Sequence, residues 1–337
     1  MPRAVAGKPV GEFDLIARYF APLSGPEGLG LIDDAALLTA RGDLVVTKDL
    51  LIEDVHFFPD DPADSVGHRA LAVNLSDLAA KGARPFCYFL GLGLPKPIDP
   101  VWLDGFTDAL FTFQQRFSIR LAGGDTTASP GPYMISVTAI GYAPGAGMIR
   151  RSGAREDDIV MVTGDLGAAA LGLAIRRGAV EGDPILVQRY RYPEPRISVG
   201  QGLAGLASAA ADISDGLLAD LGHICAASGV GAVIDDGSLP VCDAARALID
   251  RWPEGRACIW FGGDDYELVF TVPPAALDAV MRLSDRLCVP FHRIGRIVQG
   301  SGVTLVDRAG RPVQTEGMGY DHFASGMVAG KGGSDDG

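Results

Sequence analysis

The spacing of apolar residues predicts alternating strands and helices in the first half of the chain. Short runs rich in Val, Ile, Leu and aromatic side chains, bounded by Gly, Pro or Asp, are typical of buried strands. Such runs occupy residues 43–49, 85–94, 119–122 and 133–142. Apolar residues at helical spacing fill the two segments between the first three runs, 65–81 and 100–117.

Both predicted helices have recognisable ends. Asp64 stands where a side chain can cap the first helix, and Gly82 follows its last residue. Asp99, followed by a proline, is a strong start for the second helix. Asn74 and Asp77 lie three residues apart on the first helix, so these two polar side chains share one face.

A similar mixed pattern returns after a break at Pro144-Gly-Ala-Gly147. Strands are predicted at residues 159–163, 231–234 and 266–272, with two more after residue 287. Helices are predicted at residues 166–177, 195–211, 216–228 and 274–287. We therefore predict an α/β (α+β) protein with mixed sheets flanked by helices. Its domains are expected at residues 1–147 and 148–327, followed by a flexible tail at 328–337.

Composition narrows the classes of protein to which the chain can belong. Of its 337 residues, 47% are hydrophobic and 21% are charged, which suits a globular protein with two cores. A net charge of -13 argues against binding to a nucleic-acid backbone, which needs a basic surface. No apolar run approaches the roughly 20 residues of a membrane span, and no secretory leader is recognisable. We therefore expect a cytoplasmic protein that binds neither nucleic acid nor membrane.

Aspartates stand beside glycines at the ends of many of the apolar runs. The positions are Asp33-Asp34, Asp49, Asp77, Gly123-Gly-Asp125, Asp212-Ile-Ser-Asp215 and Gly262-Gly-Asp-Asp265. Asp supplies hard oxygen ligands, and Gly lets the backbone turn sharply and lets a bulky anion come close. Carboxylates that converge without cations would repel one another. The pattern therefore predicts a site for divalent metal ions that hold a phosphate ligand.

Taken singly, these motifs also have structural explanations. Residues 123–127 form a plausible turn at the end of a strand, as does Asp49. Asp77 has Lys81 one helical turn further on, as in a surface ion pair. Ser214 or Asp215 is placed to cap the helix that follows.

Three further motifs have similar alternatives. His56 suits a packed core histidine, and Arg151 suits a solvated charge. Gly164-Asp-Leu-Gly167 follows a predicted strand and opens a predicted helix, but it lacks the full G-x-G-x-x-G of a dinucleotide loop, so a simple strand-to-helix turn is favoured. The chain also lacks the G-x-x-x-x-G-K-[ST] phosphate loop, so phosphoryl chemistry here requires a different scaffold.

Six motifs, taken in order, resemble the thiamine-monophosphate kinase family. They are Ala72-Val-Asn-Leu-Ser-Asp-Leu-Ala79, Gly123-Gly-Asp-Thr-Thr127, Arg151-Ser-Gly-Ala154, Asp212-Ile-Ser-Asp-Gly-Leu217, Gly262-Gly-Asp-Asp-Tyr-Glu-Leu268 and Gly319-Tyr-Asp-His-Phe323. The resemblance spans nearly the whole chain. It implies the two-domain fold of the superfamily that contains aminoimidazole ribonucleotide synthetase and selenophosphate synthetase.

The resemblance also implies an activity and a set of site residues. The implied reaction is ATP-dependent phosphorylation of thiamine monophosphate to thiamine diphosphate, the final step of thiamine diphosphate biosynthesis. Several Mg²⁺ ions would take part, ATP would lie between the domains, and a homodimer would form through the N-terminal domains. The implied metal ligands are Asp34, Thr47, Asp49, Asp77, Asp125, Asp212 and Asp215. The implied ATP contacts are Gly124, Asp125, Arg151 and Ser214, and the implied thiamine phosphate contacts are His56, Asp264 and Tyr320.

The chain departs from the family pattern at three positions. Ile32 replaces a glycine before the Asp33-Asp34 pair. Lys48 stands where a hydroxyl residue is usual, and Asp264 replaces a glutamate that is one methylene longer. Lys48 would contribute either its backbone carbonyl or a positive charge near the phosphates.

The implied chemistry needs no general base, and none is assigned. The acceptor is a phosphate monoester, whose second pKa is near ~6, so it is largely ionised at neutral pH. Direct in-line transfer is therefore expected, with charge neutralisation as the main task of the protein.

Two other functions stay open from the sequence. One is a sister activity of the superfamily on another substrate. Selenophosphate synthetase usually has a reactive Cys or selenocysteine in a Gly-rich N-terminal stretch, whereas the first cysteine here is Cys87, inside a predicted strand. The other is a non-catalytic subunit that binds nucleotide or metal, which would lack the three substrate residues.

Overall fold

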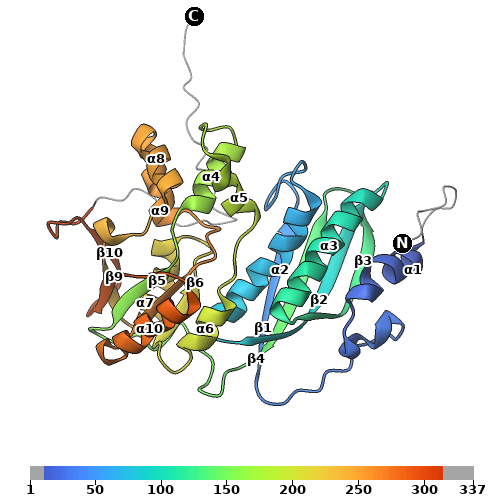
Figure 1. The fold of residues 1–337 in the computed structure, drawn as a ribbon, viewed down its shortest axis with the longest axis horizontal. Coiled ribbons are helices and arrows are strands. Elements are labelled where there is room, and N and C mark those ends of the chain that lie inside the picture. The colour runs from blue at the N-terminus through green and yellow to red at the C-terminus, as the bar shows by residue number, and fades with distance from the viewer. Residues whose placement is uncertain (1–10, 314–337) are drawn as a thin grey trace, which may run out of the picture.

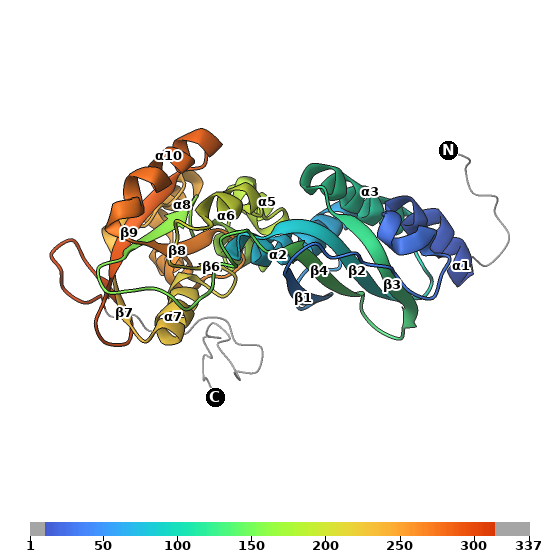
Figure 2. The same ribbon diagram turned by 90° about the horizontal axis from the view of Figure 1, so that it is seen from below.

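The computed structural model describes residues 11–313, and the motif around Tyr320 lies outside them, together with the expected tail. Two sheets lie side by side along the length of the molecule (Figures 1 and 2). The first sheet has the strand order β1-β4-β2-β3 and the second has the order β10-β7-β9-β5-β8-β6. Both sheets contain parallel and antiparallel pairs, so the predicted α/β class with mixed sheets is confirmed.

The strands of the first sheet are β1 (Leu44–Ile52), β2 (Arg84–Pro95), β3 (Arg120–Ser129) and β4 (Met134–Tyr142). Those of the second are β5 (Ile159–Thr163), β6 (Ala209–Asp212), β7 (Gly231–Asp235), β8 (Leu268–Val272), β9 (Phe291–Val298) and β10 (Gly302–Val306). The expected boundary at residues 144–147 lies in the loop between β4 and β5.

The α-helices are α1 (Glu12–Leu15), α2 (Ala63–Ala80), α3 (Pro100–Phe117), α4 (Ala168–Arg176), α5 (Pro184–Arg191), α6 (Ile197–Leu203), α7 (Leu217–Ser228), α8 (Asp243–Arg251), α9 (Ala257–Phe261) and α10 (Leu277–Leu287). Short 3-10 and π-helical turns fill much of the segment from residue 16 to residue 31. The sequence did not predict α1, α5, α8 or α9.

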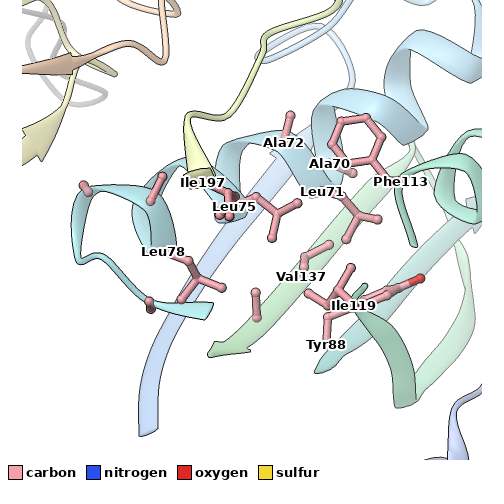
Figure 3. Packing of buried hydrophobic residues seen from close by; sticks show 14 of the residues in the cluster. Ala70, Leu71, Ala72, Leu75, Leu78, Tyr88, Phe113, Ile119, Val137 and Ile197 are labelled. Carbon is pink, nitrogen blue, oxygen red and sulfur yellow. The ribbon is translucent and has the colours of Figure 1, made fainter. Parts of the chain in front are cut away.

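One face of the first sheet is covered by helices, and the other is open except where Ala36 and Leu38 pack on a small cluster of Cys87, Ala122 and Ile140. The core beneath α2 contains Leu71, Leu75 and Leu78 of that helix, packed with Val137 of β4 (Figure 3). Ile197 of α6 belongs to the same cluster, which therefore continues to the junction with the second half of the chain.

The open face can be followed along β1. Val45 and Leu51 are buried, whereas Val46 is 59% exposed and Leu50 is 45% exposed. Side chains alternate between the faces of a strand, so the even-numbered residues of β1 lie on the open face. This leaves apolar side chains uncovered over part of the sheet.

Residues 123–127 do not form the predicted loop after a strand; they lie inside β3. Gly123 is paired with Phe89 and Asp125 with Gly91, in parallel register with β2. A Cβ atom on Gly124 would come within 2.0 Å of the carbonyl oxygen of Leu90. The glycine therefore permits a close approach of two strands. The prediction of a turn was wrong because glycine is typical of both situations.

The predicted helix at 195–211 is also wrong in its second half. Helix α6 ends at Leu203, and Ala209–Ala211 pair with β8 as part of β6. These alanines are at most 1% exposed. Burial of small side chains in the sheet outweighs the helix propensity of alanine.

The predictions for helix ends have mixed outcomes. The carboxylate of Asp99 accepts a hydrogen bond from the backbone N–H of Val101, 2.9 Å away, which confirms the predicted cap of α3. Gly82 follows α2 with a φ of 68°, as predicted. Asp64 does not cap α2, because Pro62 occupies the cap position and the Asp64 carboxylate instead accepts from the hydroxyl of Tyr192 at 2.9 Å.

Candidate active site

An acidic cluster lies where the two halves of the chain meet. It contains Thr47 and Asp49 from the covered face of β1, Asp77 from α2 and Asp212 from the end of β6. The hydroxyl of Thr47 donates a hydrogen bond to the carboxylate of Asp77. Asp49 is inside β1 and not in a turn after it, so its side chain faces α2. Elements from both halves thus bring together four of the predicted metal ligands.

Burial and mutual repulsion shape the electrostatics of this cluster. Burial, followed by the charge of Asp77, raises the pKa of Asp49 to about 7. The same causes, in the same order, raise the pKa of Asp212 to about 8. Burial also raises the pKa of Asp77, although the hydrogen bond from Thr47 opposes this shift. A bound cation would favour the ionised form of all three carboxyls.

The cluster and Asp220, whose charge acts on Asp212, have buried oxygen atoms that match a divalent cation. Oδ2 of Asp49 and Oδ1 of Asp220 are buried and have no hydrogen-bond partner among the described residues. Leaving a buried polar atom unpaired costs stability, and carboxylate oxygens are the ligands that Mg²⁺ prefers. The residues present therefore fit Mg²⁺.

Asp220 is a site residue that the sequence analysis missed. It is fully buried in the first turn of α7, and its Oδ2 accepts hydrogen bonds from the backbone N–H groups of Ser214 and Asp215, each 3.1 Å away. The predicted capping of α7 by Ser214 or Asp215 is therefore wrong, because no side chain caps this helix at Gly216. The available signal was an acid one turn into an otherwise apolar helix.

The surroundings of Asp220 are also acidic. Burial and the charge of Asp215 raise its pKa to about 7, against the effect of its backbone hydrogen bonds. Ligand atoms of Asp215, Asp220 and His223 lie within 4.8 Å of one another. Asp215, predicted from the resemblance as a metal ligand, is therefore beside a second potential oxygen ligand.

Two cations border the acidic cluster. The ammonium of Lys81 donates a hydrogen bond to the carbonyl oxygen of Ala210, 3.0 Å away in β6. Lys81 is therefore not the surface partner of Asp77, but a largely buried link between α2 and the second sheet. Arg151 is exposed, and its charge offsets part of the rise that burial causes in the pKa values of Asp77 and Asp220.

Lys48 points away from this cluster. Its ammonium donates a hydrogen bond to the hydroxyl of Ser136. Lys48 alternates with Thr47 and Asp49, so its side chain lies on the open face of the sheet. The unusual lysine therefore does not place a charge among the acids of its own chain.

Two of the predicted substrate residues, His56 and Asp264, are connected through Arg69 of α2 and Tyr190 of α5. The guanidinium of Arg69 is paired with the carboxylate of Asp264 and donates to the carbonyl oxygen of Tyr190, 2.6 Å away. The hydroxyl of Tyr190 donates to the carbonyl oxygen of His56 at 3.1 Å. The third predicted substrate residue, Tyr320, lies outside the described residues.

The loop that carries Asp264 is joined to the loop that carries Ser214. The backbone N–H of Asp264 donates to the carbonyl oxygen of Ser214 at 3.0 Å, and that of Tyr266 donates to Ile213 at 2.9 Å. A Cβ atom on Gly263 would lie 2.2 Å from the Ser214 oxygen, so this contact requires glycine. A predicted ATP residue and a predicted substrate residue are therefore held next to each other.

The other predicted residues lie elsewhere on the chain. Asp34, Gly124 and Asp125 line a cavity of about 390 Å³, which apolar residues of the N-terminal segment such as Phe13 and Phe20 help to enclose. All three predicted residues are exposed. They form a second acidic site, separate from the cluster at the junction.

Strand pairing gives the separation of the two sites. Asp49 is paired with Val137, Val137 with Leu90, and Leu90 with Gly124. Three strand spacings of roughly 4.8 Å put β1 and β3 about 14 Å apart. Asp125, one residue after Gly124, points to the opposite face of the sheet from Asp49. One chain alone does not bring Asp125 to the acidic cluster.

The turn at residues 164–167 has a structural role. The carboxylate of Asp265 accepts hydrogen bonds from the backbone N–H groups of Gly167 and Ala169, at 2.6 and 3.3 Å. The start of α4 is thus occupied by the protein's own carboxylate, which supports the strand-to-helix turn over a nucleotide loop. Burial raises the pKa of Asp265 to about 8. Within residues 11–313, none of the helices has the length and apolar character needed to span a membrane.

Comparison with known proteins identifies the family. Residues 32–143 match the N-terminal domain of the AIR synthase related proteins, and residues 155–308 match the C-terminal domain. Thiamine-monophosphate kinase of Salmonella typhimurium is 44% identical over 331 residues, covering 94% of this chain and 99% of the relative. The corresponding enzyme of Escherichia coli K12 is 42% identical, covering 94% and 99%.

Solved structures agree with this assignment. The crystal structure of thiamine-monophosphate kinase from Stenotrophomonas maltophilia K279a has a TM-score of 0.80 and 42% identity, covering 90% of this chain and 98% of its own. A structure described as AaThiL complexed with AMPPCP and TMP has a TM-score of 0.73 and 30% identity, covering 95% and 99%. The resemblance drawn from the six motifs is therefore confirmed, and the chain belongs to the thiamine-monophosphate kinase family.

Proposed function

We propose that this protein transfers the terminal phosphoryl group of ATP to thiamine monophosphate, which yields thiamine diphosphate and ADP. Its relatives carry the name of this activity, and a neighbour of the same fold was solved with AMPPCP, an ATP analogue, and TMP. The observation that carries the proposal is the buried acidic cluster at the junction, where Asp49 Oδ2 and, on the neighbouring Asp220, Oδ1 are buried without a hydrogen-bond partner among the described residues. The reaction would be the last step of thiamine diphosphate biosynthesis, in the cytoplasm.

The acidic cluster would hold several Mg²⁺ ions. The ligands in this part of the site are Thr47, Asp49, Asp77, Asp212 and Asp215. When bound at these residues, Mg²⁺ would supply charge neutralisation for the phosphates. Asp220 keeps the backbone of Ser214 and Asp215 in place through its two hydrogen bonds.

The remaining residues would bind and orient the two substrates. ATP is contacted by Gly124, Asp125, Arg151 and Ser214. Thiamine monophosphate is contacted by His56, Asp264 and Tyr320, and the aromatic ring of Tyr320 suits the cationic thiazolium.

The chemical step is a direct transfer. A bond forms between an oxygen of the acceptor phosphate and the γ-phosphorus of ATP, while the bond from that phosphorus to the β,γ-bridging oxygen breaks. The acceptor oxygen is already ionised at neutral pH, so no side chain has to remove a proton.

A homodimer would complete the site. The open face of the first sheet has exposed apolar side chains, including Val46 and Leu50, which a second copy of the chain would cover. Asp34, Gly124 and Asp125 of one protomer would then meet the acidic cluster of its partner. This arrangement accounts for the separation of about 14 Å within one chain. The contact would use the N-terminal domain, residues 1–147, while residues 148–327 would form the C-terminal domain.

The activity is tested directly by incubating the protein with MgATP and thiamine monophosphate and measuring thiamine diphosphate and ADP by chromatography. Equal amounts of both products are expected, and none should form without Mg²⁺. ATP consumption without thiamine diphosphate would exclude the proposed reaction. With a chirally labelled γ-phosphate, inversion supports direct transfer, and net retention would require a phospho-enzyme.

A further inference from the structure

Arg69 is a charged side chain buried at the junction between the two halves of the molecule. It lies on α2, and its side chain is only 4% exposed. The guanidinium carbon is 4.7 Å from the ring centre of Tyr190 and 5.7 Å from that of Tyr266. A buried charge lowers the stability of the fold unless it is paired and hydrogen-bonded. The partners of Arg69 therefore determine whether its charge can be buried here.

The polar partners of Arg69 both come from the second half of the chain. Nη1 donates to the carbonyl oxygen of Tyr190 at 2.6 Å, and Nη2 donates to Oδ1 of Asp264. Arginine can reach two acceptors at once because its guanidinium is a rigid, planar fork of donors. Arg69 therefore ties α2 to the α5 helix and to the loop before β8.

Each partner leads to a predicted substrate residue. Tyr190 holds the backbone of His56 through its hydroxyl, and Asp264 is itself the second predicted residue. Oδ1 of Asp264 also accepts from the hydroxyl of Tyr266 at 3.3 Å, whereas Oδ2 receives no hydrogen bond from the described residues. The Asp264 side chain is 23% exposed. A ligand can therefore reach Asp264 but not Arg69.

We propose that Arg69 is a positioning residue for the acceptor substrate. By holding Oδ1 of Asp264 and, through Tyr190, the segment of His56, it presents a single carboxylate oxygen to the cationic, phosphate-bearing acceptor. Arg69 acts through Asp264 and does not touch the substrate. This inference rests on the proposed function, since it assumes that His56 and Asp264 contact thiamine monophosphate.

Substitution of Arg69 tests this role. Arg69→Lys keeps the charge but cannot reach both acceptors in the same geometry, and Arg69→Met removes the charge. For both variants, KM for thiamine monophosphate should rise by about 10- to 100-fold, because small displacements of a positioned group have effects of that size. KM for ATP should stay within about twofold, since Arg69 contacts none of the predicted ATP residues.

A double-mutant cycle separates positioning from a general structural role. Asp264→Asn should raise KM for thiamine monophosphate, and adding Arg69→Met to it should raise KM little further, because the two residues act through one contact. Additive effects of the two substitutions would overturn the proposal. If Arg69→Met does not fold, as judged by circular dichroism, the same cycle is run with Arg69→Lys.

Arg196 provides a matched control. It forms another largely buried arginine–carboxylate pair, with Glu267, that involves neither His56 nor Asp264. Arg196→Lys should lower Tm without changing KM for thiamine monophosphate. If the Arg69 variants raise this KM no more than Arg196→Lys does, the proposal is wrong.

The proposed function and this inference fail in different ways. Absence of thiamine diphosphate with the wild-type protein refutes the function. The inference is judged by how much more weakly the variant binds thiamine monophosphate than the wild type does. Calorimetric titration measures this ratio of dissociation constants even where turnover is absent. Equal affinity of wild type and Arg69→Lys would overturn it.

Discussion

Asp49 combines a buried position with an oxygen atom that no described residue satisfies. Burial and the charge of the nearby Asp77 raise its pKa to about 7, so in the absence of a cation the surroundings disfavour the ionised carboxylate. Such a carboxylate lowers the stability of the metal-free protein, as is expected of a group placed for metal binding or catalysis.

We predict that Asp49→Asn lowers kcat by at least about 10- to 100-fold, the loss seen even for groups that only support a metal ligand. Without Mg²⁺ at pH 8, its Tm should equal or exceed that of the wild type, because a partly ionised buried group is replaced by a neutral one. Steady-state assays and calorimetry check both effects. Asp307→Asn, at a partly exposed acid paired with Arg311 and outside the acidic cluster, is the control and should keep full activity. Full activity of Asp49→Asn would show that Asp49 is not part of the active site.

Asp265 gives a prediction about pH. Its folded-state pKa of about 8 lies above the value of about 3.9 expected in the unfolded chain. The contribution of Asp265 to the free energy of unfolding is thus complete below pH ~4 and is lost as the pH rises through about 8. The free energy of unfolding falls by up to about 1.4 kcal/mol per pH unit in this range.

Asp265→Asn mimics the protonated carboxyl, so its free energy of unfolding should fall less steeply between pH 5 and 8 than that of the wild type. Urea unfolding at several pH values measures this slope. An unchanged slope, with a loss of stability at every pH, would mean that the carboxylate is ionised in the folded protein and caps α4 in that form.

At the scale of elements, the glycine-rich motif in strand β3 allows close packing against β2. Gly124→Ala would force a Cβ atom to within 2.0 Å of a backbone carbonyl in β2. Relief requires a shift of one strand, at a cost of roughly 1–3 kcal/mol. We expect a clearly lower Tm, whereas Gly131→Ala, where a Cβ would meet nothing within 4 Å, should change it little. Equal Tm values for the two variants would contradict the packing described for β2 and β3.

The sequence predicted the local elements better than their ends and pairings. The helices α2, α3 and α7 were found because their apolar residues recur at helical spacing, although only the cap predicted for α3 was correct. Residues 123–127 and 209–211 were misassigned because their conformation is imposed by neighbouring strands, a tertiary effect that local propensity does not contain.

The candidate site shows the same limit. The motifs predicted a set of candidate acids, but not that β1 and β3 lie at opposite edges of one sheet, since strand order is not encoded in local spacing. Asp220 was missed because its importance lies in hydrogen bonds to a preceding loop.

At the scale of the whole molecule, the two separated acidic sites lead to a prediction about subunits. If Asp125 serves the cluster of the partner, then Asp49→Asn and Asp125→Asn each inactivate the homodimer. Heterodimers formed by co-expression would retain one intact site, so a statistical mixture should recover about a quarter of the wild-type activity. If both residues act within one chain, mixing should restore nothing.

The same model predicts the effect of charge on the open face. Val46→Glu combined with Leu50→Glu should prevent association, because two charges per protomer would be buried in the contact. Analytical ultracentrifugation should then show a monomer that is folded but inactive. A dimer of unchanged stability would place the contact elsewhere.

Helix α2 carries both Arg69 and Asp77, eight residues apart, and so about 12 Å along one rigid axis. The residue proposed to position the acceptor and an acid that would hold the phosphate-bound metals are thus joined by continuous helix and not by a loop. We therefore expect the protein to select its acceptor by length. Thiamine analogues with one methylene more or fewer between ring and phosphate should still occupy the pocket, but their phosphate would stop beyond or short of the acids.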